Sequence, residues 1–224
     1  FKYTAKAFWT FKSFHSMYAQ FEQMTSDRKD YFVSPDGALF MNPAYTYSHL
    51  GISSDYRKTI AIDGKIGYGT ANTYDFSSTQ LYELAPIIRI NDKLKITPSI
   101  SYSISKNLVG YVGYDNTASN YYFGQRDVNT LTNILNAKYI FKNNLSLTVR
   151  FRHYWRYGKY DYYANLGEDG YLMRNNIDYG RDFNFNAFNT DIVFAWQYGP
   201  GSFLTIVYKT ALAQDEPLEN INYM

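Results

Sequence analysis

The sequence predicts an all-β fold, an antiparallel up-and-down transmembrane β-barrel, and three observations support this prediction. Residues 145–162 (LSLTVRFRHYWRYGKYDY) place mainly apolar side chains at odd positions and three arginines at even positions. One face of such a strand is apolar and the other is basic. Short and long connections alternate between the predicted strands. The chain also contains 25 Tyr and 16 Phe, and aromatic rings are typical of membrane–water interfaces.

Composition excludes several classes of protein. The mean hydropathy is −0.42, and the sequence has no apolar run long enough for a membrane-spanning helix. A β-barrel remains compatible, because every second residue of its strands can be polar. The absence of cysteine excludes disulfides and thiolate metal sites. A net charge of +2 gives no basis for binding nucleic acid.

The first half of the chain contains four predicted strands. The first runs from Phe1 to about Phe21, and the turn sequence Ser34-Pro35-Asp36-Gly37 lies in the polar stretch that follows. The next three strands are predicted at residues 45–54, 59–69 and 81–90. Three glycines in the 59–69 segment (Gly64, Gly67 and Gly69) and Pro86 are expected to mark bulges or bends.

The second half contains five more predicted strands, at residues 95–104, 129–141, 145–162, 188–198 and 203–212. Short turns are predicted at 55–58, 91–94, 142–144 and 199–202, and longer polar connections at 22–44, 70–80, 106–128 and 163–185. Residues 106–128 are interpreted as a long loop or, alternatively, as a loop with a hairpin that extends the flanking strands. Bacterial outer-membrane barrels show this asymmetry, with short periplasmic turns and long extracellular loops. About nine strands cannot close such a barrel, which has an even number. We therefore expect residues 1–224 to be the C-terminal part of an outer-membrane barrel domain, truncated at both ends.

Alternation along the strands predicts two chemically different faces. The charged residues expected to face a lumen are Lys65, Arg89, Lys95, Lys138, Arg150, Arg152, Arg156, Asp191 and Lys209. Such a basic interior favours anionic solutes or an acidic partner segment. Alternatively, these cations pair with carboxylates and only keep the interior wet. The aromatic residues expected at the membrane interfaces are Trp155, Tyr157, Trp196, Tyr198 and Tyr208.

The turn Gly199-Pro200-Gly201 predicts one specific contact across a hairpin. If pairing continues from it without a bulge, Asp191 lies opposite Lys209 on the lumen side, at a separation suited to a salt bridge. We also expect Arg152 or Arg156 of the preceding strand to lie near the same carboxylate.

No catalytic residue, metal ligand or cofactor is predicted. The three histidines (His15, His49 and His153) are scattered without metal-ligand spacing, and no spacing of nucleophile and base is evident. The Asp- and Asn-rich loops lack the pattern of an EF-hand calcium loop.

Several segments resemble one family of proteins. They are SSDYRK (53–58), FGQRDVNTLTN (123–133), KYIFKNNLSLTVRFRHYW (138–155), FNFNAFN (183–189) and WQYGPGSFLTIVYK (196–209). The family consists of Bacteroidota outer-membrane proteins of unknown function. Its longer members resemble an N-terminal family-nine-type carbohydrate-binding module followed by a C-terminal barrel. The resemblance begins at about residue 45, implies a barrel, and brings no catalytic residues.

Three functional hypotheses follow. The first is a non-enzymatic barrel in the bacterial outer membrane that acts as an anchor, a channel or a component of a cell-envelope assembly. Its partners would be outer-membrane lipid, other envelope proteins and a glycan bound through a domain outside these residues. The second is a barrel enzyme that acts on lipid or glycan. The third is a soluble β-sandwich binding module.

Overall fold

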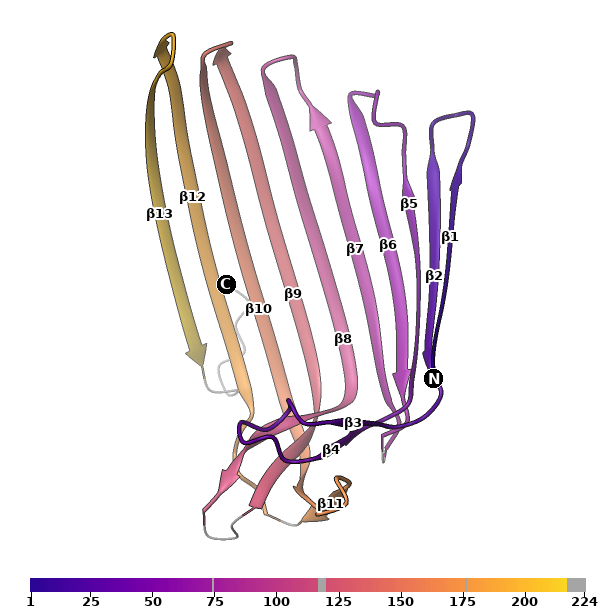
Figure 1. Ribbon diagram of the computed structural model, residues 1–224. Coiled ribbons are helices and arrows are strands. Elements are labelled where there is room, and N and C mark those ends of the chain that lie inside the picture. Colours follow the sequence, from indigo (N-terminus) through magenta and orange to yellow (C-terminus); the bar gives the residue numbers. More distant parts are fainter. Residues whose placement is uncertain (74, 117–119, 176, 217–224) are drawn as a thin grey trace.

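The computed structural model describes residues 1–73, 75–116, 120–175 and 177–216, and it is an all-β structure (Figure 1). Ten strands form one antiparallel sheet in the order β1-β2-β5-β6-β7-β8-β9-β10-β12-β13, and β11 adds to β10. β3 and β4 form a separate hairpin. Within the described residues β1 and β13 are the two edges of the sheet. The same residues contain no helix that is long and apolar enough to cross a membrane.

The bounds of the strands are as follows. The sheet contains β1 (Lys2–Thr10), β2 (Ser16–Met24), β5 (Tyr45–Ser53), β6 (Ile60–Ala71), β7 (Ser77–Arg89), β8 (Leu94–Asp115), β9 (Asn120–Lys142), β10 (Leu145–Leu166), β11 (Leu172–Asn175), β12 (Phe183–Gly199) and β13 (Ser202–Glu216). The hairpin contains β3 (Arg28–Asp30) and β4 (Phe40–Asn42).

The two ends of the sheet differ, as the connection lengths predicted. At the end we call the turn end, compact turns join β1 to β2, β5 to β6, β7 to β8, β9 to β10 and β12 to β13 (Figure 1). At the opposite end, called the loop end, the hairpin β3–β4 and the short strand β11 lie across the extended ends of β8, β9 and β10. The longer insertions therefore gather at one end.

Two predicted boundaries were wrong. The single strand expected from Phe1 to Phe21 is two strands, β1 and β2, because the chain reverses at residues 11–15, where Phe14 has a φ of 61° and the Phe11 amide donates to the His15 carbonyl at 2.9 Å. The strands expected to end at residue 104 and to begin at residue 129 extend further, to Asp115 in β8 and from Asn120 in β9, so the alternative of a hairpin within 106–128 is the correct one. The sheet path therefore has ten strands instead of nine.

Pro86 and the β6 glycines do not produce the bulges expected of them. The β6–β7 pairing keeps one register throughout. Pro86 falls opposite Pro98 of β8, and the β7–β8 ladder is interrupted between the pairs Leu84–Ile100 and Ile88–Ile96 without a register shift. Proline has no amide hydrogen to donate, so two facing prolines open the ladder locally and leave its register intact.

A small hydrophobic core lies at the loop end. Phe40 of β4 stacks on Phe123 of β9 with ring centroids 4.9 Å apart, and Leu166 completes the buried cluster. The Met41 amide also donates to the Gly170 carbonyl at 2.8 Å. These contacts fix the β3–β4 hairpin on the strand extensions.

At the turn end, side chains connect neighbouring turns. The Asp55 carboxylate accepts a hydrogen bond from the backbone amide of Arg57 at 3.0 Å and a second from Nε of the Arg57 side chain at 2.9 Å. These bonds hold the pKa of the Asp55 carboxyl well below its usual range. The Arg57 guanidinium lies 3.2 Å from the ring centroid of Phe14, so the β5–β6 turn rests on the β1–β2 turn.

We predict that Gly51→Ala destabilises the sheet and that Gly64→Ala does not. A Cβ at Gly51 would lie 1.9 Å from the Tyr18 ring, which covers this glycine from the adjacent strand, whereas one at Gly64 would meet its nearest atom at 3.5 Å. Overpacking of this kind costs roughly 1–3 kcal/mol. Urea titration measures the free energy of unfolding. Tyr18→Ala in the Gly51→Ala background should remove most of the difference, and equal stability of the two alanine variants would contradict this account.

Candidate functional site: a basic face on the sheet

The strand ladders place all nine of the predicted charged residues on one face, here called the basic face. Residues directly opposite each other on paired strands project to the same side. In the strand register, Lys209 lies opposite Asp191, and Asp191 lies opposite Arg150. This row of opposed residues continues from Arg150 through Asn136 of β9 to β8. Arg89, Lys95 and Lys138 form one further row. Arg152 and Arg156 alternate with Arg150 along β10, and Lys65 reaches the same face through the row that runs from Glu83 by way of β8 and β9 to Tyr154 of β10.

The register predicted for the last hairpin is confirmed. Asp191 is directly opposite Lys209, although a shift at Tyr198 interrupts the ladder next to the turn. The residue of β10 directly opposite Asp191 is Arg150. Arg152, one of the two arginines expected near this carboxylate, is paired with Asn189 and lines the same hollow as Asp191. The opposed side chains of Asp191 and Lys209 do not form an ion pair in the structure.

A hollow of about 420 Å³ lies on this part of the basic face. It is lined by Arg150, Arg152, Asn189, Asp191, Lys209, Thr210 and Ala211. Three cations and one carboxylate leave a formal charge of +2 in the hollow (3 − 1 = +2). The Nε atom of Arg150 is buried and has no hydrogen-bond partner. A guanidinium with unused donors beside two further cations is suited to an anion.

Two cations near the N-terminal edge of the basic face are paired with carboxylates. Lys65 Nζ lies 2.7 Å from a carboxylate oxygen of Glu83, and Lys2 Nζ lies 3.0 Å from Glu22. The Tyr45 hydroxyl also donates to Glu22. The alternative hypothesis that the cations are neutralised by carboxylates therefore describes this N-terminal part of the face. The excess of positive charge is concentrated on β8 to β13.

Toward the loop end, the basic face carries arginines against aromatic rings. The Arg126 guanidinium lies 5.2 Å from the ring centroid of Tyr160, and Arg156 lies 5.5 Å from that of Phe183. Tyr122 stacks on Tyr179 at 3.9 Å. Sequence reasoning missed this cluster because it assigned no strand register within residues 106–128 and interpreted residues 163–185 as a loop. The alternation of Tyr122, Gly124 and Arg126 could have indicated a strand.

The opposite face, here called the apolar face, carries the predicted aromatic residues in two groups. Trp196 pairs with Leu145 next to the β9–β10 turn, and Tyr198 adjoins the β12–β13 turn. Trp155 and Tyr157 lie toward the loop end, where Trp155 Nε1 donates to Asn184 at 2.7 Å. Tyr208 departs from the expected placement at an interface, since it pairs with Ile192 in the middle of the apolar rows.

On the apolar face, polar side chains replace apolar ones near Trp155. The imidazole of His153 contacts the side chains of Asn133 and Asn186, each at 3.3 Å. Asn186 and Asn184 occupy the next rows and are buried. The apolar face is therefore limited by aromatic residues at the turn end and by an Asn–His–Trp group toward the loop end.

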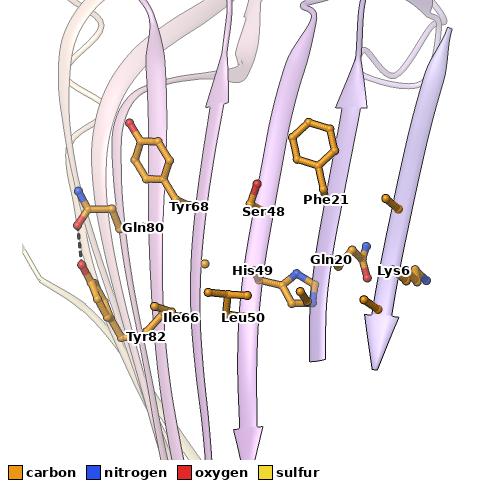
Figure 2. A pocket seen from close by; sticks show the side chains of 14 residues that line it. Lys6, Gln20, Phe21, Ser48, His49, Leu50, Ile66, Tyr68, Gln80 and Tyr82 are labelled. Atoms are coloured by element: carbon orange, nitrogen blue, oxygen red, sulfur yellow. Dashed lines mark hydrogen bonds between the residues drawn. The ribbon is translucent and has the colours of Figure 1, made fainter. Parts of the chain in front are cut away.

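The apolar face also has a shallow hollow of about 750 Å³ over β1, β2, β5, β6 and β7 (Figure 2). Its floor is made of small residues such as Ala5, Ala7 and Ala19, and it is flanked by Leu50 and Ile66. The Tyr82 hydroxyl donates to Gln80 at 2.8 Å at its margin. The lining contains no arrangement of nucleophile and base, and its shape and polarity fit an apolar chain.

Metal binding finds no geometric support in the part of the chain that the structure describes, where no group of three or more His, Asp or Glu side chains could hold an ion. A serine–histidine contact occurs in the β1–β2 turn, where Nδ1 of His15 lies 3.0 Å from the Ser13 carbonyl oxygen and 3.1 Å from its hydroxyl. A nitrogen that faces a carbonyl oxygen carries the hydrogen and donates it. Nδ1 of His15 therefore cannot accept the proton of the Ser13 hydroxyl, as a catalytic base would.

Comparison with known proteins places the chain in a family. No curated protein and no solved structure matches it. One family model, described as "Domain of unknown function (DUF5916)", matches residues 1–224. The match therefore extends over the first 44 residues as well, where no resemblance was evident from the sequence. The chain belongs to the DUF5916 family.

Proposed function

We propose that this sheet is part of a transmembrane β-barrel in the outer membrane of a bacterium of the Bacteroidota. In this proposal the apolar face contacts lipid, and the basic face lines a water-filled passage that favours anionic solutes. The same barrel would anchor an envelope assembly, including a glycan-binding module if the full protein carries one. The observation that carries the proposal is an extended apolar face that no second layer of the described residues (1–73, 75–116, 120–175 and 177–216) covers.

Exposure of the apolar face supports contact with lipid. Ile60 and Ile66 of β6 and Ile206 of β13, at the far edge of the sheet, are each more than half exposed. The six residues expected to contact lipid (Leu147, Phe151, Ile192, Phe194, Leu204 and Ile206) all lie outside the buried core. Soluble proteins rarely expose a continuous apolar surface larger than a few hundred Å².

The height of the apolar face also supports this proposal. Apolar rows extend along β10 from Leu145 to Trp155, a distance of about 34 Å along a strand at roughly 3.4 Å per residue. A strand tilted by about 45° would project this length to about 24 Å on the membrane normal, which matches the apolar band of about 25 Å in outer-membrane barrels. The aromatic residues at both limits suit the two interfaces.

The two alternative functions have less support. A soluble sandwich would bury one face under a second sheet, but here the buried cluster is confined to Phe40, Phe123 and Leu166 at the loop end. A barrel enzyme requires a nucleophile within hydrogen-bond reach of a base, and the Ser13–His15 contact has the wrong polarity for that role.

The first prediction tests location. We expect the protein to fractionate with the outer membrane, to remain there after extraction with high salt, alkaline carbonate or urea, and to be released by detergent. The physical reason is that lipid contact with the apolar face is not weakened by salt. A periplasmic protein and a known outer-membrane protein serve as controls. Release by salt alone would refute the proposal.

The second prediction tests the passage. In planar bilayers under a KCl gradient, we expect a reversal potential that indicates preference for anions. Asp191→Asn should increase this preference because it removes the one carboxylate of the hollow, and Arg150→Gln combined with Arg152→Gln should decrease it. Folding should change little, because Asp191 and Lys209 form no ion pair that Asp191→Asn would break.

Lys58→Gln in the β5–β6 turn is the matched control, since it removes a positive charge outside the basic face. Selectivity that responds equally to Lys58→Gln and to the arginine variants would contradict the assignment of the lumen. The same conclusion would follow if none of these variants altered the reversal potential.

A further inference from the structure

A third cavity lies at the loop end, beyond the two hollows described above. Its volume is about 460 Å³, within the range of about 300–1,000 Å³ typical of small-molecule sites. Five parts of the chain contribute to it, and the lining residues are Asp27, Phe40, Met41, Pro43, Asn72, Thr73, Val109, Tyr162, Ala164, Tyr171, Leu172, Met173 and Arg174. Since the β3–β4 hairpin and β11 form its walls, the cavity exists only after these insertions have packed on the sheet.

The cavity opens on the side of β9 opposite to the basic face. Val109 and Tyr162 are both paired with Gln125, and Ala164 is paired with Phe123. The register shifts in this region insert residues into β8 and β10 and not into β9. Odd residues of β9 therefore face away from Asn136 and the basic face. The cavity also lies beyond the polar Asn–His–Trp group, so it is separate from the apolar rows.

Most of the cavity wall is apolar, with Phe40, Met41, Val109, Leu172 and Met173 as its main surfaces. Asp27 is part of the scaffold, because one of its oxygens accepts from the Ala44 amide at 2.9 Å and the other from the Tyr171 hydroxyl at 3.1 Å. The hydrogen bond to Asp27 raises the pKa of Tyr171, which keeps that hydroxyl protonated. Both carboxylate oxygens of Asp27 therefore already accept a hydrogen bond from the protein.

Two polar groups of the wall have capacity for a ligand. The Arg174 guanidinium lies 4.2 Å from the ring centroid of Tyr162, and the structure pairs it with no carboxylate among the residues described. The Thr73 hydroxyl oxygen is buried and has no hydrogen-bond partner. A buried polar atom without a partner is costly. A ligand that supplies an acceptor to Arg174 and a partner to Thr73 would satisfy both groups.

We propose that this cavity binds a small monocarboxylate with an apolar body, with its carboxylate at Arg174 and Thr73 and its body against Phe40, Met41 and Leu172. A planar guanidinium held over an aromatic ring is well suited to a carboxylate. The apolar walls favour a hydrocarbon or aryl body over a sugar. This inference concerns a different site from the basic face and does not require the membrane proposal to be correct.

The test uses 4-phenylbutyrate as the probe and 4-phenylbutyramide as its uncharged analogue, titrated by calorimetry into the purified protein. The acid should bind saturably with a Kd below about 1 mM, and the amide should bind at least about tenfold more weakly, since a hydrogen bond to a charged group contributes about 1.5–3 kcal/mol. Absence of saturable binding, or equal affinity for acid and amide, would overturn the proposal.

Three variants locate the site. Arg174→Gln should weaken binding of the acid about tenfold and leave the amide nearly unchanged. Thr73→Val should weaken it severalfold without loss of fold, because its hydroxyl has no protein partner. Lys29→Gln, an exposed residue of β3 outside the cavity, is the matched control for charge. If Arg174→Gln and Thr73→Val both bind the acid as tightly as the Lys29→Gln control, the carboxylate does not bind in this cavity.

Discussion

An apolar sheet face must be covered by another apolar phase, and the account of this protein depends on that constraint. Burial of apolar area contributes roughly 25 cal/mol per Å², yet Ile60, Ile66 and Ile206 remain mostly exposed on the isolated chain. Among the residues that the structure describes, a covering layer is found at the loop end, where the β3–β4 hairpin packs on Phe123. Lipid is the covering phase that the rest of the face fits.

The basic face follows from the same alternation, but its charge is unevenly distributed. Lys65 and Glu83 neutralise each other on β6 and β7, whereas the hollow around Arg150 combines three cations with Asp191 alone. An uncompensated group of cations in a confined, hydrated space attracts anions. The loop-end cavity belongs to neither face, because its walls come from inserted segments.

The sequence predicted those features that alternation determines. The two faces, and the pairing of Asp191 with Lys209, follow from a period of two and one tight turn. The features it could not predict depend on contacts between distant segments. The pairing of Arg150 with Asp191 is set across a long connection, and the stacking of Phe40 on Phe123 joins segments more than 80 residues apart. The cavity at Arg174 requires five segments, so no local pattern could have revealed it.

The most direct test of the account is a cysteine scan of β10 from Leu145 to Arg156, which the absence of native cysteine makes clean. Each single-cysteine variant is treated in intact membranes with a water-soluble maleimide. We predict labelling at even positions such as Arg150 and Arg152, and protection at odd positions such as Leu147, Val149 and Phe151 until detergent is added. Labelling without a period of two, or of odd and even positions alike, would contradict the central claim that one face contacts lipid and the other contacts water.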